Sequence, residues 1–395
     1  MNKRGLCALA AAIAFLSAGS LNAAEKKGAA GGLEVSGNVD VVTGWQHDTS
    51  NAGGSISLIN AADSAGSGEG QLGDFRGIGT PNRDTFNFYI DQVELDFSKA
   101  FGENIRIRAD LDFGRLLSGS GRNTAGTNFQ LEQGYVTANI PVGNGVEFLI
   151  GRFNTPIGLE AVDRADNLAL SFSNLFRYLR PHNTTGAKIY YAFNDSFDFH
   201  LYVVNNLVDT IGNDTPIPSY GARFGFTWGE KGKENVIGLS YAGGPEAAAL
   251  GGNQMAHLTH IGDLDFSLHL GDSFVIAGEG MFRQDNLGGA CHVGGPAAGG
   301  ANAGKNCKAL SGQLLLGYNF NETWGGWFRY GYLHDFQGNY TTIDQQIHDF
   351  TIGGSYQVTE GAKIKLEYRL DLALPAGPIG TAFNHGVGLE FAYNF

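Results

Sequence analysis

Residue-by-residue alternation of apolar and polar side chains is the feature that most limits what this chain can fold into. It is clearest in residues 105–113 and 362–371, where nearly every polar position is charged. The charged residues are Arg106, Arg108, Asp110, Asp112, Lys363, Lys365, Glu367, Arg369 and Asp371. Because a β-strand points successive side chains to opposite faces, each segment predicts a strand with one apolar and one charged face.

Similar alternation, more or less regular, predicts sixteen strands in all. They lie at 33–45, 85–99, 105–113, 128–140, 146–153, 185–194, 197–205, 219–228, 235–242, 257–269, 274–283, 309–320, 324–334, 347–358, 362–371 and 383–395. Within 85–99 the apolar positions change phase, and a β-bulge near Asp91 reconciles the two halves.

The connections between these strands alternate between short and long. Short ones such as 141–145 and 270–273 predict tight turns at one end, and long ones such as 46–84 and 284–308 predict large loops at the other. This is the pattern of outer-membrane barrels, with both termini on the periplasmic side. A soluble sandwich alternates too, but a sheet that spans lipid must close, because lipid satisfies no free backbone group. We therefore expect an all-β, transmembrane, antiparallel up-and-down β-barrel of sixteen strands.

The first residues predict export. Lys3 and Arg4 precede an apolar run, and small residues follow up to Ala24. These are the three parts of a secretory signal peptide, and the run is shorter than the roughly 20 residues of a membrane-spanning helix. We expect a signal peptide at 1–24, a short periplasmic segment at 25–32, the barrel at 33–395, and a location in the bacterial outer membrane, surrounded by its lipid.

Charge and cysteine content narrow the class further. The chain has 26 Lys and Arg against 39 Asp and Glu, a formal net charge of −13. Nucleic-acid binding needs clusters of basic residues, so no nucleic-acid partner is expected. Cys291 and Cys307 follow the signal segment, and an exported chain permits a disulfide between them; two free thiols are the alternative.

The charged face of each strand predicts what fills the barrel. Charge is costly against lipid, so this face must line the lumen, and sixteen strands leave room for an aqueous channel. In 105–113 and 362–371 basic residues precede acidic ones, which predicts a positive band nearer the periplasmic end. Such bands set ion preference in pores. The alternative is that inward charges pair across neighbouring strands and only keep the wall hydrated.

The long segment 154–184 mixes charges with many apolar residues. Its charged residues include Glu160, Asp163, Arg164, Asp166, Arg177 and Arg180. A plain solvent loop does not need residues such as Leu168, Phe172 and Phe176, so we expect the segment to pack, with a short helix at 165–178, inside the barrel or over its mouth. It either constricts a pore or acts as a plug or lid.

Three short motifs resemble a known family. GRFNTPIGLE at 151–160, RPHNTTG at 180–186 and VNN at 204–206 resemble the putative β-barrel porin-2 (OmpL-like) family. The resemblance implies an outer-membrane pore for small hydrophilic solutes, and it supplies no catalytic set. The terminal Phe395 resembles the signal read by the barrel assembly machinery. Trimers are common among general porins of sixteen strands, so a homotrimer is one of the oligomeric states that the sequence allows.

Catalytic and metal sites are not expected. The run Gly271-Asp272-Ser273 falls in a tight turn, where these residues are ordinary turn formers. Neither Asp110 with Asp112 nor Asp263 with Asp265 lies in a calcium loop, and the cysteine spacing is not that of zinc. We therefore predict no enzyme, no metal and no cofactor. The leading hypothesis is passive diffusion through an open lumen, and the alternative is a plugged barrel that acts as a surface receptor or adhesin through loops 46–84 and 284–308.

Overall fold

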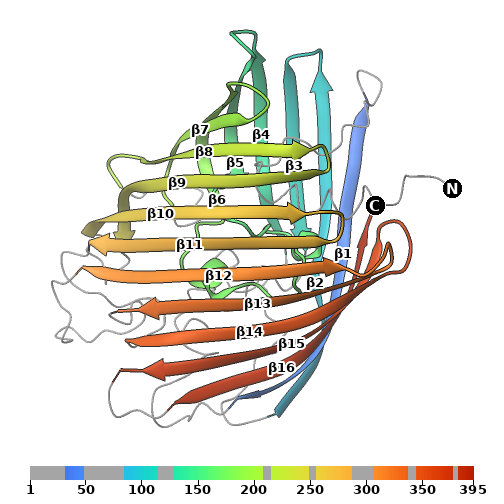
Figure 1. Cartoon of the computed structure of the whole chain (residues 1–395). Coiled ribbons are helices and arrows are strands. Elements are labelled where there is room, and N and C mark those ends of the chain that lie inside the picture. Colours follow the sequence, from blue (N-terminus) through green and yellow to red (C-terminus); the bar gives the residue numbers. More distant parts are fainter. Residues whose placement is uncertain are drawn as a thin grey trace.

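In the computed structural model the chain forms one closed antiparallel barrel of sixteen strands (Figure 1). The structure describes residues 32–48, 84–113, 129–207, 215–248, 255–286, 306–336, 344–376 and 381–395. The strands are β1 (Leu33–Asp48), β2 (Asp84–Phe101), β3 (Ile105–Phe113), β4 (Phe129–Ile140), β5 (Val146–Asn154), β6 (Asn183–Ala192), β7 (Phe197–Val204), β8 (Ser219–Glu230), β9 (Lys233–Ala248), β10 (Met255–Leu270), β11 (Phe274–Asn286), β12 (Cys307–Asn319), β13 (Trp324–Asp335), β14 (Gln345–Gln357), β15 (Ala362–Pro375) and β16 (Ala382–Asn394). Each strand pairs with its sequence neighbours and β1 pairs with β16, so the predicted fold class and strand number are confirmed.

The predicted bulge in the second strand is confirmed, and a further one lies two strands away. Gln92 pairs with Asp40 and Ile90 pairs with Val41, which leaves Asp91 as the extra residue in β2. In the same way, the shift between β3 and β4 leaves Glu132 without an opposite residue. Each bulge turns two consecutive side chains inward, which ordinary alternation forbids.

The two faces of the barrel differ as the alternation predicts. In β16, Phe383, Val387 and Leu389 are exposed on the outside, while Asn384 and Glu390 are fully buried on the inside. The same division runs round the wall. Within the described residues, no helix is long and apolar enough to cross a membrane.

Tight turns gather at one end of the barrel, and the chain closes there. Gly271 and Gly361 adopt left-handed backbone angles, with φ of 67° and 87°, in the turns that precede β11 and β15. At the same end Phe395 and Gly37 exchange two backbone hydrogen bonds, of 3.0 and 3.2 Å, which join the last residue to β1. Figure 1 shows the C-terminus beside these turns, as expected for the short-turn side.

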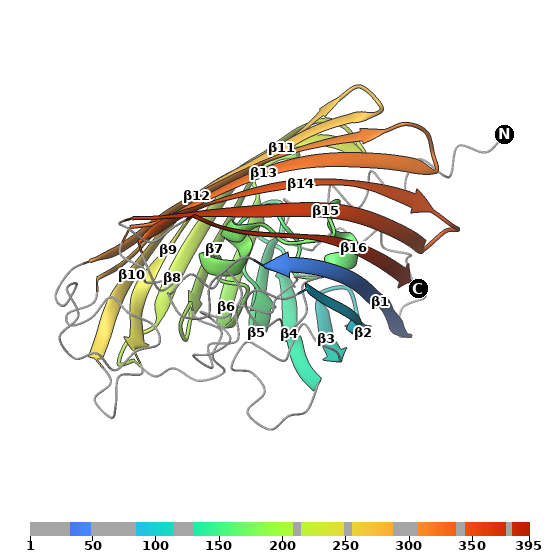
Figure 2. The same ribbon diagram turned by 90° about the horizontal axis from the view of Figure 1, so that it is seen from below.

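The segment between β5 and β6 folds into the barrel and not over its mouth. Every residue from Thr155 to His182 is buried or half-buried, and both views show the green helical turns within the outline of the wall (Figures 1 and 2). We call residues 155–182 the inner loop. It contains a 3-10 turn, η3 (Arg164–Asp166), and one short helix, α3 (Asn174–Tyr178).

The single helix predicted at 165–178 is wrong. Only residues 174–178 are α-helical, and 167–173 are not helical. The reason is that backbone groups between Leu170 and Phe172 bond to charged side chains of the wall and not to each other. Strong partners from elsewhere in the fold override local helix formation, because a helix needs those same groups for its own ladder.

Three predictions lie outside the described residues. They are the signal peptide at 1–24, nearly all of the periplasmic segment at 25–32, and most of the two long loops 46–84 and 284–308.

Candidate functional site

Two arginines and one glutamate of the wall hold the middle of the inner loop. Glu367 of β15 accepts the backbone N–H groups of Leu170 and Ser171, at 2.8 and 3.0 Å. Its Oε2 also accepts the indole N–H of Trp327 at 3.1 Å. A carboxylate with three donors is well satisfied, and hydrogen bonds to a charged group contribute about 1.5–3 kcal/mol each.

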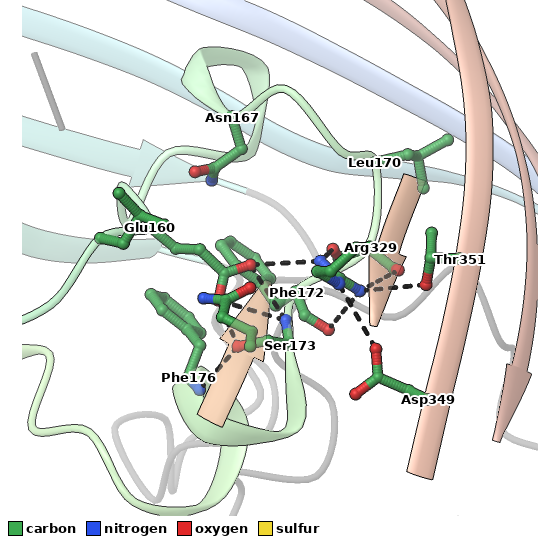
Figure 3. Close-up of polar contacts among 12 residues, drawn as sticks. Glu160, Asn167, Leu170, Phe172, Ser173, Phe176, Arg329, Asp349 and Thr351 are labelled. Atoms are coloured by element: carbon green, nitrogen blue, oxygen red, sulfur yellow. Dashed lines mark hydrogen bonds and ion pairs between the residues drawn. The ribbon is translucent and has the colours of Figure 1, made fainter. Parts of the chain in front are cut away.

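Arg329 of β13 and Arg369 of β15 bind the carbonyl oxygens that follow. Figure 3 shows Arg329 among its partners in the inner loop and the wall. Arg329 donates to the carbonyl of Ser171, to its hydroxyl at 3.0 Å, and to the carbonyl of Phe172 at 3.3 Å. Arg369 donates to the same hydroxyl at 3.1 Å and to the carbonyl of Phe172. We call Glu367, Arg329 and Arg369 the loop clasp.

The two arginines of the clasp are themselves compensated by carboxylates. Arg329 Nη1 lies 3.3 Å from Glu160 of the inner loop, and its Nε lies 3.4 Å from Asp349. Arg369 Nη2 lies 2.7 Å from Asp371. These side chains are almost inaccessible to solvent, so each charge is buried together with its partner, which is the arrangement that low-dielectric surroundings require.

Aromatic rings and a cap stiffen the end of the inner loop. The rings of Phe172 and Phe176 stack with centroids 4.0 Å apart, and His182 packs 4.2 Å from Phe176. Ser173 is the N-cap of α3, and its hydroxyl accepts the N–H of Phe176 at 3.1 Å. The hydroxyl also donates to Glu160.

Nearer its start, the inner loop meets β1, β2, β15 and β16, a continuous part of the wall that includes one strand of the loop clasp. Arg164, which is fully buried, lies 2.8 Å from Asp91 and 3.9 Å from Asp40. Lys365 donates to the carbonyl of Arg164 at 3.2 Å and lies 2.9 Å from Glu390. Here too, loop and wall carry opposite charges.

Two acidic residues of the inner loop lie beside wall groups as well. Asp163 accepts a hydrogen bond from Gln92 at 2.8 Å, and Asp166 lies 3.5 Å from the amide of Asn394. Burial, reinforced by Glu132, raises the pKa of Asp163 well above its ordinary value. Burial also raises the pKa of Asp166, although Lys363 and Lys365 oppose the shift.

The structure therefore brings together most of the residues that the alternation singled out. Arg108 lies 2.7 Å from Asp110 of its own strand and 3.4 Å from Asp96 of β2. Only the contact with Asp96 is a cross-strand pair of the kind expected if inward charges pair between neighbouring strands. Arg106 and Lys363 are half-buried on the same wall, and Arg177 and Arg180 are buried in the inner loop, where they pack on Tyr178 and Phe176. Ion preference stays a prediction.

Sequence reasoning missed several members of the site. Arg329, Asp349 and Asp91 bind the inner loop or its partners, yet none was predicted as a site residue, and Asp91 was named only as the position of a bulge. Arg329 and Asp349 occupy inward positions in two predicted strands, so reading the alternation there for charge would have found them. Glu132 needed the second bulge, which shows in the sequence only as a change of phase between Leu131 and Val136.

Cys307, the first residue of β12, is disulfide-bonded. Its expected partner, Cys291, lies outside the described residues, so the pairing of these two cysteines stays a prediction.

A closed barrel with an apolar outer face, a charged inner face and an inward-folded loop defines a transmembrane β-barrel of the porin type. The chain belongs to the family described as putative beta-barrel porin-2, OmpL-like, whose model matches residues 32–394. This confirms the resemblance drawn from the short motifs. Family and fold point to the bacterial outer membrane and to channels rather than enzymes.

Solved structures of outer-membrane proteins share the fold at low sequence identity. The outer membrane channel DcaP of Acinetobacter baumannii has a TM-score of 0.64 at 12% identity, covering 93% of this chain and 98% of that one. The anion-selective porin from Comamonas acidovorans has a TM-score of 0.57 at 14% sequence identity, covering 92% of this chain and 100% of that one. Pseudomonas putida OprB has a TM-score of 0.56 at 11% identity, covering 92% of this chain and 94% of that one. No curated protein sequence matches the chain.

Proposed function

We propose that this protein is an outer-membrane porin whose water-filled lumen lets small hydrophilic solutes or ions diffuse passively. The inner loop narrows the lumen and sets which solutes pass. Solutes move down their gradients, with no turnover and no cofactor. The outer face sits in membrane lipid, and we also propose that Phe395 is read by the barrel assembly machinery.

One observation carries the proposal: an inner loop bearing charge of both signs is fixed to a charged wall inside a sixteen-stranded barrel. Barrels of this size leave an aqueous channel unless something fills them. A loop held at mid-length by Arg329, Arg369 and Glu367 keeps its shape, so it restricts the lumen to the same extent in every molecule.

A plugged barrel is the second candidate, and one observation favours it. No residue from Thr155 to His182 is exposed, so the inner loop is as well packed as a structural core. If it closes the lumen completely, the working surface of the protein shifts to the long extracellular loops, and the function becomes that of a receptor or adhesin.

Single-channel conductance separates the two candidates. The refolded mature chain is inserted into a planar bilayer, and current steps are recorded under a salt gradient. Stable open steps support the porin, and the sign of the reversal potential shows which charge dominates the lumen. A folded barrel that stays silent, but that opens when Arg329 is replaced by alanine, establishes the plug and contradicts the porin as stated.

A further inference from the structure

The interior of the barrel carries more acidic than basic charge. Among the described residues, the buried side chains include 17 of Asp and Glu but only 9 of Lys and Arg. Nearly all of them belong to the inner face of the wall or to the inner loop, because the outer face is apolar. The half-buried charges inside the barrel show no excess of basic residues. They include Arg106, Arg108, Arg283, Lys363, Asp96, Glu147, Asp163, Asp166 and Asp198. The formal charge of the interior is therefore net negative.

Ion pairs engage the buried bases and leave acids over. Five of the nine buried bases form ion pairs with buried carboxylates, and they are Arg164, Arg223, Arg329, Lys365 and Arg369. A close pair of opposite charges is nearly neutral when seen from several ångströms away, so it adds little to the potential in the lumen. The potential is set instead by the acids that no cation of the protein neutralises.

Asp263, on the inner face of β10, is an acid of this kind. Only 3% of it is exposed, and neither of its carboxylate oxygens accepts a hydrogen bond. Two guanidinium groups act on it electrostatically, but Arg223 is paired with Asp265. The other, Arg180, donates to the carbonyl oxygen of Glu160. When ionised, the carboxylate of Asp263 therefore acts on the lumen with its full charge.

Two further acids continue this negative charge along the wall. Asp265 lies two positions further along β10 on the same face, and Glu279 of β11 lies directly opposite Asp265. The hydrogen-bond donors of Glu279 are neutral: the N–H of Leu159 at 3.0 Å and the amide of Gln313 at 3.2 Å. We call Asp263, Asp265 and Glu279 the acidic strip. Only one of its three carboxylates is paired with an arginine, so the strip is net negative when ionised.

We propose that the lumen passes cations in preference to anions, and that Asp263 is a residue that determines this preference. The inference rests on the proposed function, because it names the class of solute that passes: small inorganic cations and other small positively charged solutes. Wall charges beside low-dielectric surroundings focus the electric field in a lumen and raise the local concentration of ions of opposite sign. The effect arises from the summed charge and needs no coordinated ion.

The test is the reversal potential of the refolded mature chain in a planar bilayer, measured at neutral pH under a KCl gradient. The dilute side is held at about 0.1 M, where the screening length is about 10 Å and wall charges still act on passing ions. The wild-type potential should have the sign given by K⁺ permeation. Asp263→Asn should lower the permeability ratio of K⁺ to Cl⁻ by about twofold to threefold, the effect of one unit charge several ångströms from the ion path at a water-like dielectric constant. Because the substitution removes an unpaired buried charge, the barrel should still fold.

Asp272→Asn is the matched control, since it removes one carboxylate from the exposed turn that follows β10. It should leave the permeability ratio unchanged. Each variant is first shown to keep the heat-modifiable migration of a closed barrel. A wild-type channel that prefers Cl⁻, or that does not discriminate, overturns the inference and leaves the porin in place. Equal ratios in the wild type and in folded Asp263→Asn overturn the role of Asp263. A folded barrel that does not conduct overturns the proposed function, and the inference with it.

Discussion

The inner loop contacts the wall in two regions, on β13 and β15 and on β2–β4, and these regions differ in the charges that the loop meets. On β13 and β15 charged side chains bind neutral backbone groups of the loop: Arg329 and Arg369 bind its carbonyl oxygens, and Glu367 binds its N–H groups. Arg329 also forms an ion pair with Glu160 of the loop. On β2–β4 its Asp163 meets Glu94, Asp112 and Glu132, which carry the same sign.

The difference between the two sides separates two ways of docking a loop. The loop clasp is complete within the chain, so it needs nothing from solution. On the acidic side burial raises the pKa of Asp163, so the contribution of this contact to loop docking depends on pH. The contacts on β13 and β15 therefore hold the loop under all conditions, whereas the contacts on β2–β4 change in strength with pH.

Replacing Arg329 with alanine should give the largest effect. It removes the hydrogen bonds of Arg329 to Ser171 and Phe172 and breaks its ion pairs with Glu160 and Asp349. Breaking a buried ion pair from one side costs about 3–5 kcal/mol. We expect amide hydrogen exchange in 168–173 to rise sharply, and single-channel conductance to increase.

Arg223→Ala is the matched control for that variant. Arg223 forms a buried ion pair with Asp265, within the wall and away from the loop clasp. It should lower the thermal stability of the barrel to a similar extent while exchange in 168–173 stays slow. Equal loop exchange in both variants would mean that the clasp does not hold the loop.

Acidification tests the other side of the comparison. Because burial raises the pKa of Asp163, the docked loop binds a proton more tightly than the released loop does. Docking on β2–β4 should therefore become more stable as pH falls from neutral towards the ordinary carboxyl pKa of about 4. Hydrogen exchange of 160–166, corrected for the intrinsic pH dependence of exchange, measures this.

Asp163→Asn should flatten that pH dependence and should stabilise docking at neutral pH. Asp195→Asn, in the exposed turn after β6, should keep the wild-type profile. Docking that became less stable as pH falls would contradict the prediction that burial raises the pKa of Asp163 in the docked loop.

Glu367→Gln should have a smaller effect than Arg329→Ala. The amide keeps an oxygen that can accept from Leu170 or Ser171, but it loses the charge that strengthens both bonds. Charged acceptors exceed neutral ones by about 1 kcal/mol per bond. Exchange at 170–171 should rise modestly. Glu279→Gln, which removes the charge that accepts Leu159 N–H at 3.0 Å, should act at 159 and leave 170–171 unchanged.

The strands were predictable because their signal is local. In 105–113 and 362–371 the lumen face alternates strictly with the lipid face, and this pattern does not depend on the rest of the chain. The bulge at Asp91 was found because it shifts the phase of large apolar residues. Leu131 and Val136 carry the same kind of signal for Glu132, but the strand is shorter there and the shift was not read.

The contacts of the inner loop were not predictable in the same way. Leu170 and Glu367 are 197 positions apart, and no local pattern indicates that one will bind the other. The helix expected at 165–178 failed for this reason: its apolar spacing was compatible with a helix, but its backbone groups found stronger partners on β13 and β15. Local helix preference determines the backbone conformation only where side chains distant in sequence do not compete for the same backbone N–H and C=O groups.

Ser173→Ala should give the smallest effect, because it acts within the inner loop and leaves both wall contacts in place. The hydroxyl caps α3 through Phe176 N–H, and replacing an N-cap serine with alanine costs about 1 kcal/mol. Since α3 has only five residues, exchange should rise in 174–178 and not in 168–171. Ser196→Ala, in a turn at the end of the barrel, is the control. If exchange in 168–171 rose equally, the cap and the clasp would form one cooperative unit, and the loop could not be held firmly on one side while staying adjustable on the other.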